Sequence, residues 1–228
     1  MPPEWLTTFA WIWLGLAFAS VIVMLVDIGR GYRQPMGVMN AVWPVTALYL
    51  GPVALAAYWR YGRPYTARYQ GEHSTGMPDT PYRVRVAIST SHCGAGCTVG
   101  DILAEWLIFA AAITILGAPI FASFVLDYTF AFLFGIVFQA LAIASMQKVR
   151  LRELARRTVQ ADALSLTAFE LGLFAWMALT YFAFFTNPHI AADDPVYWLM
   201  MQVGMILGFC SSYPANVWLI RRGVKEAM

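Results

Sequence analysis

Charged residues are scarce in this chain of 228 residues: they make up 12% of it, while hydrophobic residues make up 60%. Ordinary soluble domains carry about 25% charged residues, so this balance excludes that class. The net charge is only +2, which gives no indication of nucleic-acid binding. The nucleotide-binding loop, the zinc-protease helix and the haem-attachment motif are missing too, which disfavours a primary pump, a metalloprotease and a c-type cytochrome. The sequence predicts a membrane protein that has the lipid bilayer, and no nucleic acid, as a partner.

Six apolar runs reach the length of about 20 residues that a helix needs to cross the hydrocarbon core. They lie near residues 6–27, 36–58, 99–125, 128–146, 163–186 and 197–220. No basic residue precedes the first run and no small-residue cleavage site follows it, so a retained helix is expected rather than a signal peptide. The predicted fold class is all-α, a polytopic membrane bundle of about six transmembrane helices. One transmembrane domain over residues 1–228, with a cytoplasmic loop at 59–98, accounts for the whole chain.

The placement of the basic residues predicts an orientation. With the N-terminus inside, 13 of the 15 lysines and arginines fall in the segments 59–98, 147–162 and 221–228. Only Arg30 and Arg33 then lie outside. Cytoplasmic loops carry an excess of lysine and arginine, so both termini are expected to be cytoplasmic. The predicted location is the inner membrane of a bacterium, as a multi-pass protein.

Cysteine and histidine are also rare, with three of each, yet three of these six residues lie together. The stretch reads Ser91-His92-Cys93-Gly94-Ala95-Gly96-Cys97 and stands where a polar segment enters an apolar run. Thiolates select soft metals such as Cu(I) or bind Zn²⁺, and glycines permit a turn that brings two sulfurs to one ion. His92, Cys93 and Cys97 are therefore candidate metal ligands. Two alternatives stay open: a redox-active thiol pair, and small buried thiols at a glycine-rich helix entry.

Methionines give a second indication of a soft metal. Met39, Met201 and Met205 fall in the outer halves of their predicted spans, and thioethers bind Cu(I) without deprotonation. A handover from outer methionines to inner cysteines would suit such an ion. The alternative is that these methionines are adaptable apolar filler.

Acids inside the predicted spans indicate a polar pathway. Asp101 and Glu105 follow Cys97 at four-residue steps, so the three side chains share one helix face. On other spans, Asp162, Glu170 and Gln139 are expected at comparable depths. Ionisable residues within a membrane are expensive and mark ion or proton paths by default. The alternative is that each is a buried hydrogen-bonding group that fixes helix packing.

The cysteine stretch, with Gly100-Asp101 and Glu105-Trp106, resembles the signature of an uncharacterised bacterial integral-membrane family catalogued as domain of unknown function 4396. Further segments share the resemblance, which extends over about residues 36–228. They are Met39-Asn40-Ala41-Val42-Trp43-Pro44, Ala161-Asp162-Ala163-Leu164-Ser165, Met201-Gln202-Val203-Gly204-Met205 and Tyr213-Pro214-Ala215-Asn216. The resemblance implies a membrane fold and carries no activity.

Three functions compete on the sequence. The first is a membrane protein that binds or translocates a soft metal ion, with Cu(I) as the predicted ion. The second is a thiol-redox membrane enzyme linked to quinones, and the third is a non-catalytic subunit of a larger membrane complex. A homo-oligomer or such a complex would supply the protein partners. No catalytic residue is assigned, and whether the protein is an enzyme stays open.

Overall fold

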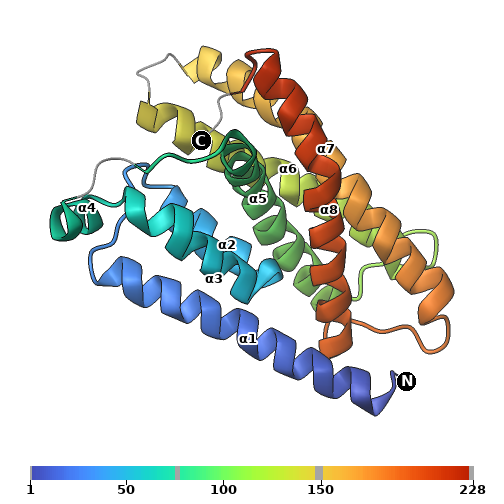
Figure 1. Ribbon diagram of the computed structural model, residues 1–228. Coiled ribbons are helices and arrows are strands. Elements are labelled where there is room, and N and C mark those ends of the chain that lie inside the picture. The colour runs from blue at the N-terminus through green and yellow to red at the C-terminus, as the bar shows by residue number, and fades with distance from the viewer. Residues whose placement is uncertain (1, 75–77, 147–150, 226–228) are drawn as a thin grey trace.

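The computed structural model describes residues 2–74, 78–146 and 151–225, with side chains except at 142–146, 151–158, 160 and 161. Its fold is all-α, as predicted, and the described residues form eight α-helices (Figure 1). Their bounds are α1 Glu4–Gly29, α2 Met39–Leu50, α3 Pro52–Ala57, α4 Ala67–His73, α5 Tyr82–Ala111, α6 Pro119–Met146, α7 Leu151–Leu179 and α8 Pro195–Arg221. Shorter π and 3-10 helices follow α3 and α7: η1 Tyr58–Gly62, η2 Arg63–Tyr65 and η3 Thr180–Phe184.

Among the described residues, five helical segments are long and apolar enough to cross a membrane, one fewer than predicted. They are α1, α5, Pro119–Leu141 of α6, Asp162–Phe184 of α7 and η3, and α8. The predicted spans at 6–27, 163–186 and 197–220 match α1, the α7 segment and α8 to within two residues at each end. By length and composition, the chain is a multi-pass membrane protein.

The predicted second span, 36–58, is a helical hairpin instead of a crossing helix. Its two arms, α2 and α3, meet at Gly51, whose φ of 55° is open to glycine and strained for other residues. Gly51 lies against Ala17, midway along α1. The chain then returns, and the Tyr58 hydroxyl donates a 2.8 Å hydrogen bond to Asp27 near the C-terminal end of α1. The hairpin therefore enters and leaves at the same end of the bundle.

This fold-back changes the count of crossings and the position of the termini. Both termini on one side required the segment 36–58 to cross. In the structure, the first described residues and the end of α8 lie at opposite ends of the bundle (Figure 1).

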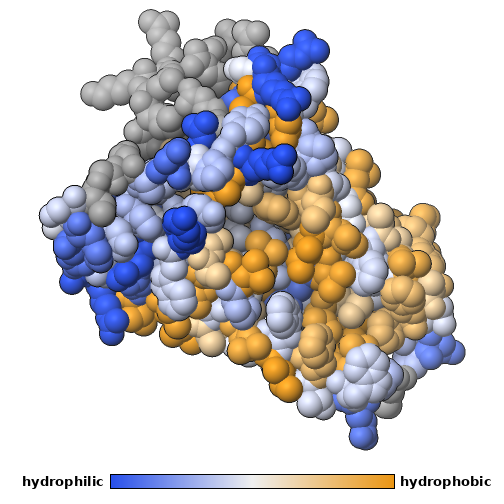
Figure 2. All heavy atoms as spheres, viewed as in Figure 1, coloured by the Kyte–Doolittle hydropathy of each residue, from blue (hydrophilic) through white to orange (hydrophobic). Residues whose placement is uncertain are grey.

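The fold-back also gathers the basic residues. By their position in the fold, all the described lysines and arginines lie where α1 and α8 end, which we call the basic end. They are Arg30, Arg33, Arg60, Arg63, Arg68, Arg83, Arg85, Arg152, Arg156, Arg157, Arg221, Arg222 and Lys225. Figure 2 shows hydrophilic residues gathered at the upper left, with apolar residues over the helices toward the lower right. Arg30 and Arg33, the two exceptions to the predicted orientation, thus join the other basic residues.

The predicted boundaries of the third and fourth spans, 99–125 and 128–146, are wrong. Helix α5 begins at Tyr82, so residues 82–98 of the predicted loop 59–98 are helical and the cysteine stretch lies inside a helix. The chain reverses between α5 and α6, where Leu116 and Gly117 both have positive φ, and α6 starts at Pro119. Glycine followed by proline marks such a break in sequence, but the apolar residues around it hid the signal.

Candidate functional site

The cysteine stretch lies inside α5 and contains two kinds of buried residue, glycines that contact α6 and cysteines. On one face, Gly96 and Gly100 press against the backbone of α6: a Cβ added at Gly100 would stand 2.5 Å from the Ala131 nitrogen, and one at Gly96 2.8 Å from the Gly135 Cα. These glycines allow two helices to approach closely and do not form the predicted turn. Cys93 and Cys97, which stand at a four-residue step on the same helix, are fully buried.

The two thiols pack with Tyr49 of α2 and Phe169 of α7 in the apolar interior. Four-residue spacing on a helix holds Cβ atoms about 5–6 Å apart, whereas a disulfide requires about 3.8 Å. An intact α5 therefore opposes a bridge between them, and the thiol-redox interpretation loses geometric support. Two sulfurs on one face can still hold one soft ion between them.

His92 points elsewhere. Its ring lies edge-on to Phe138 of α6, with centroids 6.3 Å apart, and it interacts electrostatically with Asp162 and Lys225. Among the described residues, no three or more histidine, cysteine, aspartate or glutamate side chains come together in a way that could hold a metal ion. The predicted trio of metal ligands is thus not assembled around one point. Structural zinc sites take four ligands, so the thiol pair suits Cu(I) better than Zn²⁺.

The predicted methionine ligands separate into two places. Met39 packs with Met24 and Trp43 in the apolar cluster beneath the α2–α3 hairpin. Met201 and Met205 belong to the cluster that holds the cysteines. Met205 contacts the helix that carries the cysteines: its sulfur accepts a hydrogen bond from the hydroxyl of Thr98, the residue after Cys97, at 3.8 Å. Because α2 begins at the basic end, Met39 lies there, and the three methionines do not form one outer set.

Acids continue the cysteine face of α5. Asp101 and Glu105 follow Cys97 at four-residue steps and are 0% and 4% exposed. Glu170 of α7 lies beside Cys97 and interacts electrostatically with Asp101. Asp101 of α5 and Glu170 of α7, which come from two different spans, are therefore neighbours in the interior.

Nearer the opposite end, Glu105 lies beside Asp127 of α6 and Tyr197 of α8. Together these residues form what we call the polar column: Cys93, Cys97, Asp101, Glu105, Asp127, Glu170 and Tyr197. From Cys93 to Glu105 it follows α5 for about 18 Å at 1.5 Å per residue. Asp127 fell between the third and fourth predicted spans, and Tyr197 was not predicted as part of the pathway. Both assignments depend on where α6 and α8 begin and on which face of each helix is turned inward.

Many polar atoms of this interior have no hydrogen-bond partner among the described residues. They include both carboxyl oxygens of Asp101 and of Glu170, both ring nitrogens of His92, and the Tyr49 hydroxyl. Gln139, predicted as part of the pathway, is buried on α6 with its amide oxygen unpaired. Folded proteins leave few such atoms unpaired, and each one calls for a functional or solvent-based explanation.

At the basic end the interior closes on an ion pair. The Lys225 ammonium lies 3.0 Å from Asp162, and their side chains are 1% and 3% exposed. Burial is the largest single influence and opposes the charge on Lys225. The attraction and hydrogen bond of Asp162, together with the attraction of Cys93 and Cys97, nevertheless raise the pKa of Lys225 above its ordinary value. Sequence reasoning missed Lys225 because a lysine four residues beyond the end of a helix normally lies in water.

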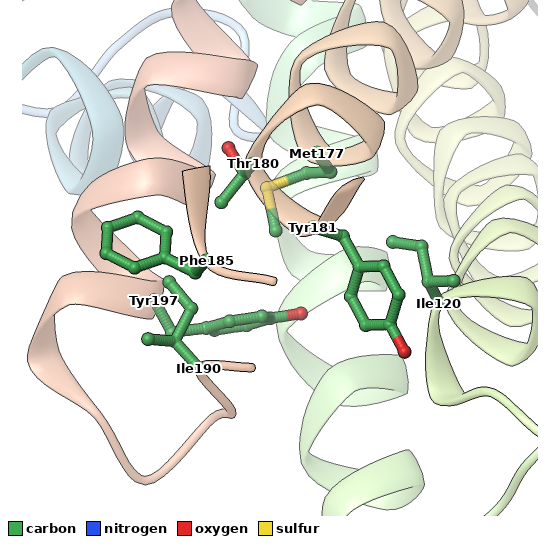
Figure 3. A pocket seen from close by; sticks show the side chains of 7 residues that line it. All are labelled: Ile120, Met177, Thr180, Tyr181, Phe185, Ile190 and Tyr197. Carbon is green, nitrogen blue, oxygen red and sulfur yellow. The ribbon is translucent and has the colours of Figure 1, made fainter. Parts of the chain in front are cut away.

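At the opposite end a small apolar pocket lies beside the column. Figure 3 shows its lining side chains, which come from α6, from α7 with η3, from the following loop and from α8. They are Ile120, Met177, Thr180, Tyr181, Phe185, Ile190 and Tyr197. Tyr197 is shared by the pocket and the polar column, so the pocket lies at the outer margin of the column.

The profile of a family described as a domain of unknown function (DUF4396) matches residues 84–225, well over half of the chain. The match begins near the start of α5 and ends at Lys225, so it contains the whole polar column and leaves out α1 and the α2–α3 hairpin. It is shorter than the predicted 36–228. No curated protein and no solved structure matches the chain.

Proposed function

The chain belongs to the domain of unknown function 4396 family, whose name states no activity, and we propose that it moves a cation across a membrane through the polar column. One observation carries the proposal: a file of buried acids and thiols in which both carboxyl oxygens of Asp101 and of Glu170, and one of Asp127, have no hydrogen-bond partner among the described residues. Burying a carboxyl group that lacks a partner costs free energy, and membrane proteins keep such groups where ions or protons pass.

The thiol pair supports a soft cation, with Cu(I) as the substrate. Two sulfurs on one helix face, with Glu170 beside them, offer a site that attracts positive charge and selects against hard ions. Met205 is placed to assist them, since its sulfur lies 3.8 Å from the hydroxyl of Thr98, the residue after Cys97. The acids beyond Cys97 then give the ion negatively charged positions toward the opposite end.

The distribution of basic residues supports an orientation for this transport. Cytoplasmic segments carry the lysines and arginines, so the basic end faces the cytoplasm. With five crossings, the C-terminus is then cytoplasmic and the N-terminus lies on the outer side. The membrane is proposed to be the inner membrane of a bacterium, and the apolar residues exposed along α1, such as Trp5, Trp11 and Phe18, face lipid.

Binding of Cu(I) to purified protein tests the thiol pair. We expect the Cys93→Ser/Cys97→Ser protein to lose Cu(I) to a competing chelator at a much lower chelator concentration than the wild type, because a hydroxyl coordinates Cu(I) weakly. Cys210→Ser is the matched control, since Cys210 is an exposed thiol outside the column. Equal copper retention by the double variant and the wild type would rule out the thiol site.

Transport is tested in proteoliposomes that contain a Cu(I)-sensitive dye. Wild-type protein is expected to carry Cu(I) inward, and both the double cysteine variant and Glu170→Gln are expected to stop it. If the wild type moves protons but no Cu(I), the column conducts and the choice of substrate is wrong.

A further inference from the structure

We infer that Asp162 forms a cation site at the basic end of the polar column and that Lys225 is its built-in competitor, an ammonium tethered to the end of α8. This inference deepens the proposed function and rests on it for the nature of the competing ion. The placement of Lys225 itself rests on geometry alone.

The first step is the position of the ammonium. Lys225 contacts Asp162 at 3.0 Å, in a place from which both side chains are almost wholly withdrawn from solvent. It also interacts electrostatically with Cys93 and Cys97. A positive charge is therefore already present between the aqueous phase and the thiol pair.

The second step is that polar atoms near Lys225 remain without hydrogen-bond partners among the described residues. Asp162 keeps one carboxyl oxygen without a partner among the described residues, and so do both ring nitrogens of His92, which interacts electrostatically with the ion pair. The unpaired Asp162 oxygen and His92 nitrogens are atoms that can bind a cation, so their presence near the ammonium indicates a site that a different cation could occupy. A metal cation with its remaining water ligands would use the carboxylate and the imidazole together.

The third step is that hydrogen bonds between α7 and α8 fix the position from which Lys225 reaches Asp162. Serine and asparagine side chains hold α8 to α7 next to Asp162: Ser212 donates to the Ser165 carbonyl at 2.8 Å, and Asn216 to the Ser165 hydroxyl at 2.9 Å. Helix α8 therefore ends at a fixed point beside the site.

A left-handed residue then turns the chain inward. Gly223 has a φ of 69°, and the amides of Val224 and Lys225 both donate to the Leu219 carbonyl, at 3.0 and 3.4 Å. This is the pattern of a glycine C-cap, in which residues beyond the glycine fold back on the helix. No heavy atom lies within 4 Å of a Cβ added at Gly223, so glycine is needed there for its backbone conformation.

Because only a short segment, residues 222–225, and non-covalent contacts hold the Lys225 ammonium in place, the site opens when that segment moves away from it. In the closed state Lys225 neutralises Asp162 and blocks the approach of another cation to the thiols. In the open state Asp162 and His92 face the cytoplasm and accept the ion that the thiol pair then receives.

Accessibility of the thiols tests the closure without requiring transport. Full-length protein in nanodiscs, carrying Cys210→Ser, is treated with the small cationic thiol reagent methanethiosulfonate ethylammonium, and labelling of Cys93 and Cys97 is followed by mass spectrometry. Lys225→Asp should raise the labelling rate at least about tenfold, because it increases the population of the open state. Arg221→Asp is the matched control: it makes the same charge change at an exposed position on α8 and should leave the rate unchanged.

Two further variants protect the test from a folding defect. Asp162→Lys combined with Lys225→Asp restores the ion pair in reverse and should return labelling to the slow rate. Gly223→Ala keeps both charges but strains the turn, and should give an intermediate rate. The closure is overturned if Lys225→Asp and Gly223→Ala label no faster than Arg221→Asp.

Silver ion, a soft monovalent cation, separates this inference from the proposed function. If Lys225→Asp speeds labelling and Ag⁺ slows it again, with His92→Ala reducing that protection, both stand. If labelling speeds up but Ag⁺ gives no protection and the wild type moves no Cu(I), Lys225 is a closure and the cation assignment of the site is overturned.

Discussion

Asp27 in the α1–α4 region accepts hydrogen bonds from Tyr58 at 2.8 Å and from Arg63 at 3.0 Å. Asp101 in the α5–α8 region is fully buried, and neither of its carboxyl oxygens has a partner among the described residues. The first aspartate has the surroundings of a structural ion pair. Asp101 carries the free-energy cost of burying a carboxyl group without a hydrogen-bond partner, which is typical of a functional group within a membrane.

Glycines differ between the two regions in the same way. Gly15 of α1 has nothing within 4 Å of an added Cβ, whereas Gly100 of α5 is pressed against the α6 backbone. Gly15 lies on an exposed face of α1, and Gly100 lies in a close contact between α5 and α6. Most of the buried polar atoms without a partner among the described residues therefore lie in the family region, whereas the N-terminal region contributes only the hydroxyls of Thr46 and Tyr49 to that set.

The largest expected effect comes from Gly100→Ala. The new Cβ would meet the Ala131 nitrogen at 2.5 Å, and backbone atoms cannot move aside as a flexible side chain can. Overpacking typically costs about 1–3 kcal/mol, and we expect a loss at or above the upper end of that range. Thermal unfolding in detergent measures it, with Gly15→Ala as the control that should keep or raise the midpoint, because alanine favours a helix. Similar losses in both variants would refute the difference between the two faces.

Next is Asp101→Asn, which should abolish Cu(I) flux in proteoliposomes while leaving the unfolding midpoint unchanged or higher. Replacing a buried carboxyl that lacks a partner removes a desolvation cost and breaks no hydrogen bond. A variant that transports normally would show that Asp101 is outside the path. A variant that unfolds early would show that the carboxyl has a structural role.

Asp27→Asn is expected to do the reverse. Its amide can still accept from Tyr58 but no longer neutralises Arg63, so we expect a loss of about 1–2 kcal/mol in stability. Flux per folded molecule should stay near the wild-type value. Loss of flux without loss of stability would place Asp27 in the transport path and break the comparison.

The smallest effect concerns pH at the α4 contact. Hydrogen bonds from Arg68 and from Tyr32 lower the pKa of Glu72 below its ordinary value, so this contact stabilises the fold at neutral pH. That stabilisation is lost as the pH falls through the lowered pKa and Glu72 takes up a proton. Proteolysis within 74–81 should therefore speed up slightly at acidic pH in the wild type. The Glu72→Gln protein should be cleaved at the faster rate already at neutral pH, and its cleavage rate should change little as the pH is lowered.

The arrangement of α5 shows how far sequence reasoning reaches. The steps from Cys97 to Asp101 and Glu105 predict one helix face, and the structure places all three there in the interior. The same reasoning took the glycines beside Cys97 for a turn. Glycine in a turn and glycine in a close helix contact have the same composition, and only the presence of α6 opposite Gly100 distinguishes them.

The sequence by itself determined the class of the protein, because burying long apolar runs in lipid depends on composition and length alone. It also indicated which residues are candidates for chemistry, since acids in such runs are costly wherever they lie. Only the tertiary structure decided that 36–58 folds back, that His92 turns away from the cysteines, and that Lys225 closes on Asp162. These outcomes depend on a single left-handed glycine, on the face that each helix presents and on a cap beyond a helix end. Each is a local choice whose energy is fixed by neighbours that are distant in the sequence.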